Sequence, residues 1–261
     1  GKAIPENASI VYNGDSYYLK QTALGVFEHT FDQPTEATNF RLSANKVISK
    51  EYVLEVVKTP SLVAFEMELD YPGYTGKRDE VLKSTGNATI PEGTRVTWRV
   101  QTKNTDEVAL KTRDTTYLFE QSNQDFNYNK AVYQKLDYSI NTSNVNLRDY
   151  ENLSFTLGVV RDAYPEIDVS AKKDSTNSQL TYFLGRVSDD YGLSKLRLVY
   201  YPIGEENQRE TEVLPVNKTT VDQFVYTFPG NLMLEEGVAY EYYFEVFDND
   251  AIHNYKSSKS G

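Results

Sequence analysis

The stretch from Tyr71 to Val100 constrains the fold more than any other part of this 261-residue sequence. In its last six residues polar and apolar side chains alternate, which is the period of a strand with one face in a core and one face in water. Pro91 and Gly93, two turn formers, come just before this run. We therefore predict a strand of an antiparallel β-sandwich, with Trp98, the only Trp of the chain, as a buried anchor.

The composition favours sheet over helix along the whole chain. The 21 Tyr and 12 Phe lie in alternating segments that are rich in Val and Thr, and these residue types are enriched in strands. Strand-like runs recur at short intervals with turn residues between them, a spacing typical of immunoglobulin-like sandwiches. The predicted fold class is all-β, with tandem immunoglobulin-like β-sandwich domains.

A sequence pattern that occurs three times suggests where the domains end. Tyr52–Val57, Phe155–Val160 and Tyr242–Phe247 share the order aromatic, any residue, Leu or Phe, any residue, Val, then Val or Phe. Pro60 and Pro165 follow the first two copies, and proline marks a change of local structure. We interpret each copy as the closing strand of one domain. The sequence thus predicts a small β domain over 1–59 and immunoglobulin-like sandwiches over 60–163 and 164–261.

Some local predictions are specific enough to be tested. Asn13 and Gly14 predict a tight hairpin turn, because both residues tolerate positive φ. The run Ala131–Ile140 predicts a single strand. No long helical pattern is present: Asn231–Glu236 and the region of Asp222 could each form one helical turn, but loops are the expectation there.

Net charge and cysteine content exclude several classes of function. The chain has 27 Lys and Arg against 38 Asp and Glu, a formal charge of −11 and a sequence pI near 4.8. An acidic surface repels phosphate groups, so neither nucleic acid nor an anionic membrane surface is an expected partner. With no Cys there is no disulfide, no thiolate nucleophile and no Cys-based metal site.

No run of residues approaches the ~20 apolar residues of a membrane span, and the start carries no secretory signal. We expect membrane contact only through segments outside this sequence. The short linkers at Lys58–Pro60 and Arg161–Pro165 predict a semi-rigid arrangement of the domains.

The sequence points to no catalytic site. His29 and His253 are the only histidines and lie in different predicted domains, and no residue at a fixed spacing is evident as their partner, so we interpret both as structural or solvated. Acidic residues are too numerous for any pair to indicate glycoside hydrolysis. We predict that the chain is not an enzyme, with no catalytic, cofactor-binding or metal-ligating residue and no cofactor.

Two acidic motifs leave calcium open. Asp189-Asp190 and Asp248-Asn249-Asp250 lie at predicted strand ends, where hard oxygen ligands could gather around Ca²⁺. The other interpretation is turn chemistry, because Asp and Asn bond their own backbone at such corners. The sequence alone does not decide between them.

Exposed tyrosines leave a sugar-stacking surface open as well. In an alternating strand one Tyr of each adjacent pair is expected to face the core, which argues against such a surface. The candidates are Tyr17, Tyr18, Tyr71, Tyr74, Tyr200, Tyr201, Tyr242 and Tyr243.

Taken in order, several of these motifs resemble a known family. The motifs are Tyr52–Val57, Leu69–Gly76, Ile90–Trp98, Asp189–Leu193 and Asp248–Ala251. Together they resemble domain-of-unknown-function family 4175, large membrane-anchored envelope proteins of the Bacteroidetes and some Proteobacteria. The resemblance spans most of the chain, from about Ile4 to Ser257.

The resemblance implies location and architecture rather than a mechanism. Family members have membrane helices before a periplasmic array of immunoglobulin-like domains, and this chain would be the array. No catalytic residue is known in the family to be carried over. We expect a non-enzymatic extracytoplasmic scaffold that acts as a semi-rigid spacer and docks an envelope protein. The alternative is a carbohydrate-binding array of a polysaccharide-handling protein.

Overall fold

The protein is described here from a computed structural model that covers residues 4–177 and 179–261. The chain divides into two compact units, one formed by residues up to Thr59 with the loop Asn144–Arg148, and the other by Pro60–Ser143 with Asp149–Gly261. The finer division into three domains stays a prediction. None of the helices in the described residues has the length and apolar character needed to cross a membrane.

The first unit is a small β structure with little buried apolar surface. Its main sheet has the order β2-β1-β5-β6, β7 pairs with β5, and β3 forms a hairpin with β4. Only Ala8 and Ile10 of its described residues are buried apolar side chains. The strands are β1 (Ala8–Tyr12), β2 (Asp15–Tyr18), β3 (Lys20–Ala23), β4 (Val26–Glu28), β5 (Thr38–Ala44), β6 (Val47–Ile48) and β7 (Tyr52–Leu54).

The predicted Asn-Gly hairpin turn is confirmed in this unit. Tyr12 pairs with Asp15, which leaves a two-residue loop. Asn13 has φ 52° and Gly14 has φ 86°. A two-residue loop of this kind needs positive φ at both positions, which these two residues adopt readily.

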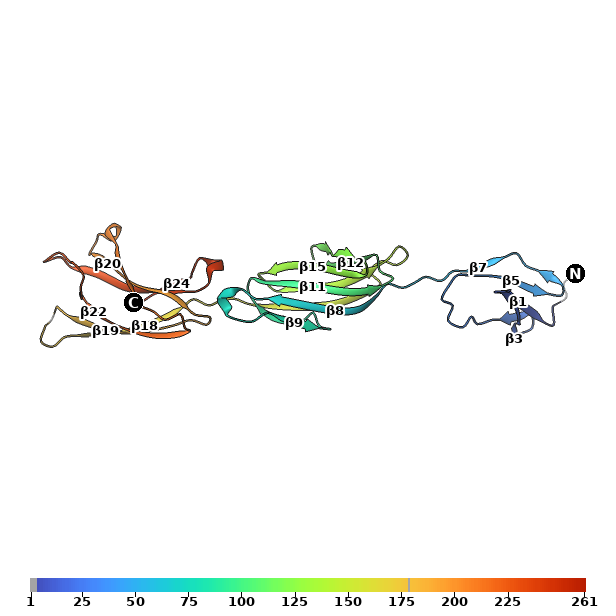
Figure 1. Cartoon of the computed structure of the whole chain (residues 1–261), viewed down its shortest axis with the longest axis horizontal. Coiled ribbons are helices and arrows are strands. Elements are labelled where there is room, and N and C mark those ends of the chain that lie inside the picture. The colour runs from blue at the N-terminus through green and yellow to red at the C-terminus, as the bar shows by residue number, and fades with distance from the viewer. Residues whose placement is uncertain (1–3, 178) are drawn as a thin grey trace. The chain divides into compact units, whose positions relative to one another are not determined.

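The second unit begins with a sandwich of two five-stranded sheets, which we call the middle sandwich (Figure 1). One sheet has the order β14-β15-β11-β8-β9 and the other β10-β17-β16-β12-β13. All pairs are antiparallel except β10 with β17. The strands are β8 (Ser61–Asp70), β9 (Glu80–Lys83), β10 (Ala88–Pro91), β11 (Thr94–Lys103), β12 (Glu107–Lys111), β13 (Thr116–Leu118), β14 (Glu120–Ser122), β15 (Asp125–Val132), β16 (Leu136–Ser143) and β17 (Glu151–Val160).

Trp98 anchors this core as predicted. It is fully buried on β11, and its indole Nε1–H donates to the Tyr138 hydroxyl at 2.9 Å. The Tyr138 hydroxyl in turn donates to the Gly86 carbonyl at 2.7 Å. Gly86 has no room for a side chain, because a Cβ there would lie 2.5 Å from the Phe155 ring. One hydroxyl therefore joins the two sheets of the sandwich through a buried polar chain.

The C-terminal sandwich follows in the same unit, with the sheets β18-β19-β22 and β21-β20-β23-β24. Its core includes Leu196, Leu198, Phe244 and Val246, which come from the paired central strands. The strands are β18 (Glu166–Lys173), β19 (Thr181–Ser188), β20 (Leu193–Pro202), β21 (Glu210–Leu214), β22 (Val221–Phe228), β23 (Tyr240–Asp248) and β24 (Ser257–Lys259). Three 3₁₀ turns complete the unit, η1 (Gly73–Thr75), η2 (Glu206–Gln208) and η3 (Ala251–His253).

The all-β class with tandem immunoglobulin-like sandwiches is thus confirmed, but several local predictions are wrong. Ala131–Ile140 is not one strand: β15 ends at Val132 in one sheet and β16 starts at Leu136 in the other. Both segments supply apolar side chains to the same core, Val132 from β15 and Tyr138 and Ile140 from β16, and this hides the short crossing between them.

The turn predicted at Pro91 needs correction, and neither of the two possible helical turns forms. Pro91 belongs to the edge strand β10 rather than to the turn, a place where its missing N–H is tolerated. Asp222 lies within β22, and Asn231–Glu236 contains no helix. Tyr242–Phe247 is not a closing strand, because β24 follows it and pairs with it.

Replacing Tyr138 by Phe tests the buried polar chain. The substitution leaves the Trp98 N–H and the Gly86 carbonyl without their shared partner, so the free energy of unfolding should fall by about 1–3 kcal/mol. Urea unfolding followed by Trp98 fluorescence measures this change. Tyr164→Phe, at an exposed tyrosine of the same unit, is the matched control and should change stability by less than about 0.5 kcal/mol. Equal stability of the two variants would contradict the role given to the chain.

Candidate functional site

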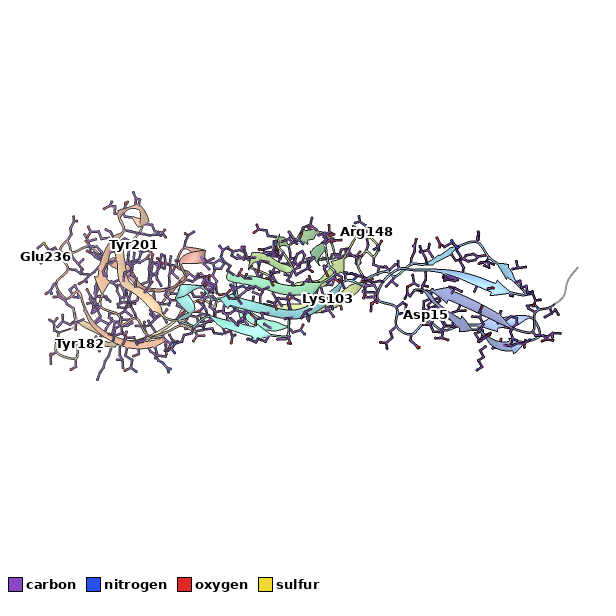
Figure 2. All side chains as sticks on the ribbon, turned by 45° about the vertical axis from the view of Figure 1, so that its right-hand side comes forward. Asp15, Lys103, Arg148, Tyr182, Tyr201 and Glu236 are labelled. Carbon is purple, nitrogen blue, oxygen red and sulfur yellow. The ribbon has the colours of Figure 1, made fainter. Side chains whose placement is uncertain are left out.

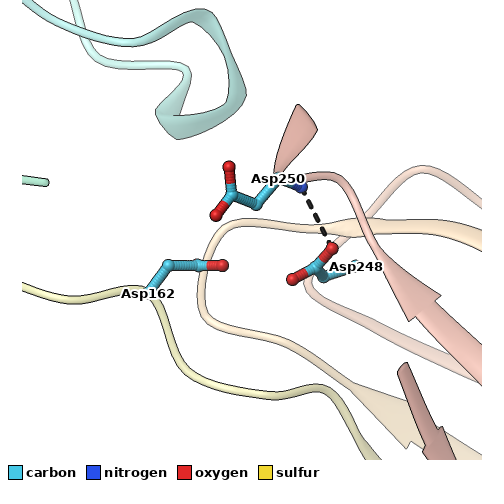
Figure 3. Close-up of side chains that lie close together, drawn as sticks. All are labelled: Asp162, Asp248 and Asp250. Atoms are coloured by element: carbon cyan, nitrogen blue, oxygen red, sulfur yellow. Dashed lines mark hydrogen bonds between the residues drawn. The ribbon is translucent and has the colours of Figure 1, made fainter. Parts of the chain in front are cut away.

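Acidic side chains from three segments meet where the middle and C-terminal sandwiches of the second unit contact each other. Asp162 lies two residues after β17, in the connection to the C-terminal sandwich. Asp189 and Asp190 follow β19, while Asp248 ends β23 and Asp250 precedes η3. Figure 3 shows the carboxylates of Asp162, Asp248 and Asp250 converging. One oxygen of each lies within 4.8 Å of the others. We call these five residues the acidic junction.

The Asp189 turn explains part of this acidity by local backbone chemistry. The Asp189 Oδ2 accepts the N–H groups of Tyr191 at 3.0 Å and Gly192 at 2.7 Å. Gly192 has φ 141°, in the region that favours glycine. The sequence Asp-Asp-Tyr-Gly therefore forms a side-chain-stabilised turn after a strand.

The Asp248 turn is built in the same way. Asp248 Oδ1 accepts the N–H of Asp250 at 3.1 Å, the bond drawn as a dashed line in Figure 3. Asp250 Oδ1 then accepts the N–H of Ile252 at 2.8 Å and caps η3. Turn chemistry, one of the two interpretations left open by the sequence, accounts for these bonds but leaves other oxygens of the same carboxylates unexplained.

Lys256 supplies the positive charge of the junction. Its ammonium bonds Asp162 and lies 3.1 Å from Asp250 Oδ2 and 3.4 Å from Asp248 Oδ2. The Lys256 side chain is only 10% exposed, and those of the three aspartates are fully buried. A buried ammonium needs partners of opposite charge to offset its lost hydration. The three carboxylates are those partners.

The pKa shifts follow from burial and these bonds. Burial lowers the pKa of Lys256, but its hydrogen bonds with Asp162 and Asp250 outweigh burial and leave that pKa above its ordinary value. Burial raises the pKa of Asp250, yet hydrogen bonds from His253 and Lys256 bring it below the usual range. At Asp162 burial dominates over Lys256 and raises the pKa to about 7. Burial also raises the pKa of Asp189.

The junction holds the two sandwiches together through the Tyr71–Gly76 segment. The Asn249 amide donates to the Tyr74 carbonyl at 3.0 Å and to the Tyr191 carbonyl at 3.3 Å. The rings of Tyr74 and Tyr191 meet edge to face, with centroids 5.3 Å apart. Three motifs that the sequence analysis singled out separately therefore meet at one place: the Tyr-Pro-Gly-Tyr turn, Asp-Asp-Tyr-Gly and Asp-Asn-Asp.

His253 contacts this junction, although its side chain is 38% exposed. Its Nδ1 lies 2.5 Å from Asp250 Oδ2, and its Nε2 lies 3.7 Å from Glu92 Oε1 of the middle sandwich. The expectation that no residue at a fixed spacing partners this histidine is wrong, because Asp250 stands three residues earlier. The other histidine, His29, lies in the first unit with its Nε2 3.3 Å from the Tyr12 hydroxyl.

The family model for a domain of unknown function, DUF4175, matches residues 41–223. The chain belongs to the DUF4175 family. The match confirms the resemblance seen in the motifs, and it includes the Tyr71–Gly76 and Asp189–Gly192 segments of the junction. Asp248, Asp250 and Lys256 lie beyond the matched range. A search of curated proteins found no match to this chain.

Solved structures that are similar to this DUF4175 chain include the following three. A chimeric titin Z1Z2 carrying a decorin peptide is 11% identical, with 77% of this chain and 93% of that chain covered and a TM-score of 0.31. Titin domains A168–A170 are 9% identical, with 97% and 85% covered and a TM-score of 0.27. The chicken CNTN1 FN1–FN3 domains are 11% identical, with 97% and 90% covered and a TM-score of 0.22.

The tyrosines considered for sugar stacking are dispersed. Tyr17 stacks on Tyr12 with centroids 4.8 Å apart, so one of its ring faces is covered. Tyr200 and Tyr201 are both buried, against the expectation of one Tyr per pair in the core. The remaining candidates are 83% exposed (Tyr18), bonded to Glu80 (Tyr71), at the junction (Tyr74), packed on Phe228 (Tyr242) or under the Lys259 ammonium (Tyr243).

Sequence reasoning missed Asp162 of the acidic junction and its cationic partner Lys256. Asp162 lies in the short linker Arg161–Pro165 that the sequence predicts, and no motif includes Lys256. The available signal was positional: a carboxylate just after a predicted strand end, and a lysine six residues after Asp250. Neither signal indicates that Asp162 and Lys256 contact each other, because they are 94 positions apart in the sequence.

Replacing Lys256 by Met tests the role of the ammonium. Met has a similar length but no charge, so three buried carboxylates lose their shared partner, and the free energy of unfolding should fall by about 3–5 kcal/mol. Urea unfolding followed by far-UV circular dichroism measures the loss. Lys218→Met, at an exposed lysine of the same sandwich, should change stability by less than about 0.5 kcal/mol. A Lys256→Met chain as stable as this control would contradict the proposed charge balance.

Proposed function

We propose that this DUF4175 chain is a non-enzymatic interaction module, a semi-rigid spacer with a protein-docking surface in the extracytoplasmic part of a membrane-anchored bacterial envelope protein. The observation that carries the proposal is the acidic junction. Around it, residues of the C-terminal sandwich contact the rest of the unit. Lys256 bonds Asp162 in the connection, Asn249 bonds Tyr74 of the middle sandwich, and His253 lies 3.7 Å from Glu92 of the same sandwich. Contacts of this kind restrict bending between neighbouring domains, which is what a spacer requires.

The same contacts argue against an acid–base role for these carboxylates. Asp250 is buried and bonded to the Ile252 N–H, His253 and Lys256. A general acid or base must reach a proton on a substrate. Side chains consumed by internal bonds are better suited to joining the sandwiches than to turnover.

The docking surface that we propose is the outer face of the β18-β19-β22 sheet. Leu184 on β19 lies directly opposite Val225 on β22, and both are exposed, at 55% and 78%. Tyr182, two residues before Leu184 and therefore on the same side of β19, is exposed, and Figure 2 labels it at the surface of the C-terminal sandwich. Adjacent exposed apolar side chains on a sheet favour contact with another protein.

The free edge of the same sheet extends this surface. All eight residues of β22 pair with β19 on one side, and the described residues provide no strand on its other side. An unpaired edge can accept a strand from a partner, with main-chain hydrogen bonds for affinity and neighbouring pockets for specificity. The proposed partner is therefore an envelope protein that contributes an extended segment.

The carbohydrate-binding alternative requires two or three coplanar exposed aromatic rings. Of the tyrosines considered for that role, Tyr18 is highly exposed, while others are buried (Tyr200, Tyr201), bonded to Glu80 (Tyr71) or stacked on Tyr12 (Tyr17). For this reason we propose protein docking ahead of glycan binding. The proposed periplasmic location is supported by membership of the DUF4175 family together with the resemblance described above.

Replacing Val225 by Lys tests the docking face. A lysine there places a charge on the apolar pair without entering the core, so capture of the partner from a crosslinked native envelope fraction should fall at least about tenfold. Mass spectrometry of the captured proteins measures this loss. Val213→Lys, at a 64% exposed position on β21 in the other sheet, is the matched control and should capture the same protein as the unmodified chain. Unchanged capture by Val225→Lys would refute docking at this face.

A further inference from the structure

The acidic junction contains two overlapping groups of carboxylates that share Asp162. The first is Asp162 with Asp248 and Asp250, and the second is Asp162 with Asp189 and Asp190. In each group one oxygen per residue lies within 4.8 Å of the others. Like charges at this separation repel one another unless a cation or a proton lies between them.

Lys256 satisfies the first group only. Its ammonium contacts Asp162 Oδ2, Asp248 Oδ2 and Asp250 Oδ2. No Lys, Arg or His of the described residues forms an ion pair with Asp189 or Asp190. Within the second group, Asp189 and Asp190 therefore lack a cationic side chain among the described residues, and Asp162 shares its only one with Asp248 and Asp250.

Two carboxylate oxygens of this second group have no hydrogen-bond partner. Asp162 Oδ1 and Asp189 Oδ1 are buried and accept no hydrogen bond, although the other oxygen of each carboxylate is bonded. The Asp162 side chain is fully buried, and Asp189 is 8% exposed. A buried carboxylate oxygen without a partner is costly, and native proteins rarely leave one in that state. Two such oxygens, on two aspartates of the same cluster, indicate that a positively charged ligand is missing there.

We propose that Asp162, Asp189 and Asp190 bind one Ca²⁺ ion. Asp162 then bridges two cations, with Oδ2 on the Lys256 ammonium and Oδ1 on the metal. Asp189 keeps its Oδ2 on the turn N–H groups and offers Oδ1 to the ion. Asp190 is exposed and leaves room for water to complete the coordination.

The donor set selects the metal class. All three ligands are carboxylates, and hard oxygen donors favour Ca²⁺ or Mg²⁺ over Zn²⁺, which prefers histidine and cysteine. Ca²⁺ binds oxygens at about 2.3–2.6 Å and accepts irregular geometry, so oxygens up to about 5 Å apart can share one ion. Mg²⁺ demands a tighter and nearly ideal octahedron. Three oxygens from two separate segments, Asp162 after β17 and Asp189 with Asp190 after β19, suit Ca²⁺ better.

The ion adds a function that the docking proposal does not contain. It connects Asp162, in the connection between the sandwiches, to the turn after β19, and so makes the stiffness of the junction depend on calcium. The inference rests on the carboxylate geometry alone. It stands or falls independently of whether β22 docks a partner.

Calorimetric titration of the EDTA-treated, dialysed chain with CaCl₂ tests the site. We expect one ion per chain with a Kd of about 10⁻⁴–10⁻³ M, the range of extracellular calcium modules. Where free Ca²⁺ is about 100 times Kd, the equilibrium constant for folding should rise about a hundredfold. An equal response to MgCl₂ would overturn the assignment to calcium.

Variants locate the ion. Asp190→Asn removes an exposed ligand without disturbing the core and should weaken Ca²⁺ binding at least about tenfold. Asp189→Asn should do the same, because Asn keeps an oxygen for the turn N–H groups. Asp114→Asn, at an exposed aspartate of the middle sandwich, should leave the affinity unchanged. Absence of Ca²⁺ binding up to 10 times the expected Kd, or undiminished binding by Asp190→Asn, would refute the site.

Discussion

The contact of the Lys256 ammonium with Asp162, Asp248 and Asp250 is the interaction on which the second unit depends. All four side chains are removed from water, so each would be costly alone. A buried ion pair of this kind adds little stability over an apolar replacement, but breaking it is expensive because the remaining charges stay buried. Its consequence is geometric: Asp162 has to stay at the turn that follows β23, and that turn sits against Tyr74 of the middle sandwich.

The hydrophobic cores stabilise each sandwich, and the junction fixes the orientation of one sandwich against the other. Each sandwich is stabilised by its own cluster, around Trp98 in one and Phe244 in the other. The junction between them is polar and aromatic instead, with the Asn249 amide and the Tyr74–Tyr191 ring pair at its centre. Polar contacts depend on direction, so they fix an orientation more strictly than an apolar interface of the same size.

Much of the fold could be predicted from the sequence, because period-two alternation is a local signal. The run that ends at Val100 predicts β11 and the burial of Trp98, and Asn13-Gly14 predicts its hairpin turn. Where apolar segments from two sheets are contiguous, as at Val132 and Leu136, alternation alone cannot show that the chain crosses between sheets. The edge strand β18 shows the same alternation, with Ile167 and Val169 half-buried between exposed Glu166, Asp168 and Ser170.

Only part of the candidate site could be predicted from the sequence, for a different reason. Asp189, Asp190, Asp248 and Asp250 are evident as acidic turns, since their spacing is local. Their convergence with Asp162 and Lys256 depends on how one sandwich meets the next, and a single sequence carries no signal for contacts between such distant positions. The interpretation as turn residues is confirmed for one carboxylate oxygen each of Asp189, Asp248 and Asp250. It does not account for the second oxygen of each carboxylate.

The central claim is that the junction makes the two sandwiches of the second unit one rigid body. The chain has no Cys, so cysteines introduced at the exposed positions Val63 and Val213 allow spin labels at only those sites. The distance distribution between the labels, measured by double electron–electron resonance in the presence of CaCl₂, should then show a single narrow peak. A broad distribution, spread over many distances, would show that the sandwiches move freely and would contradict the account.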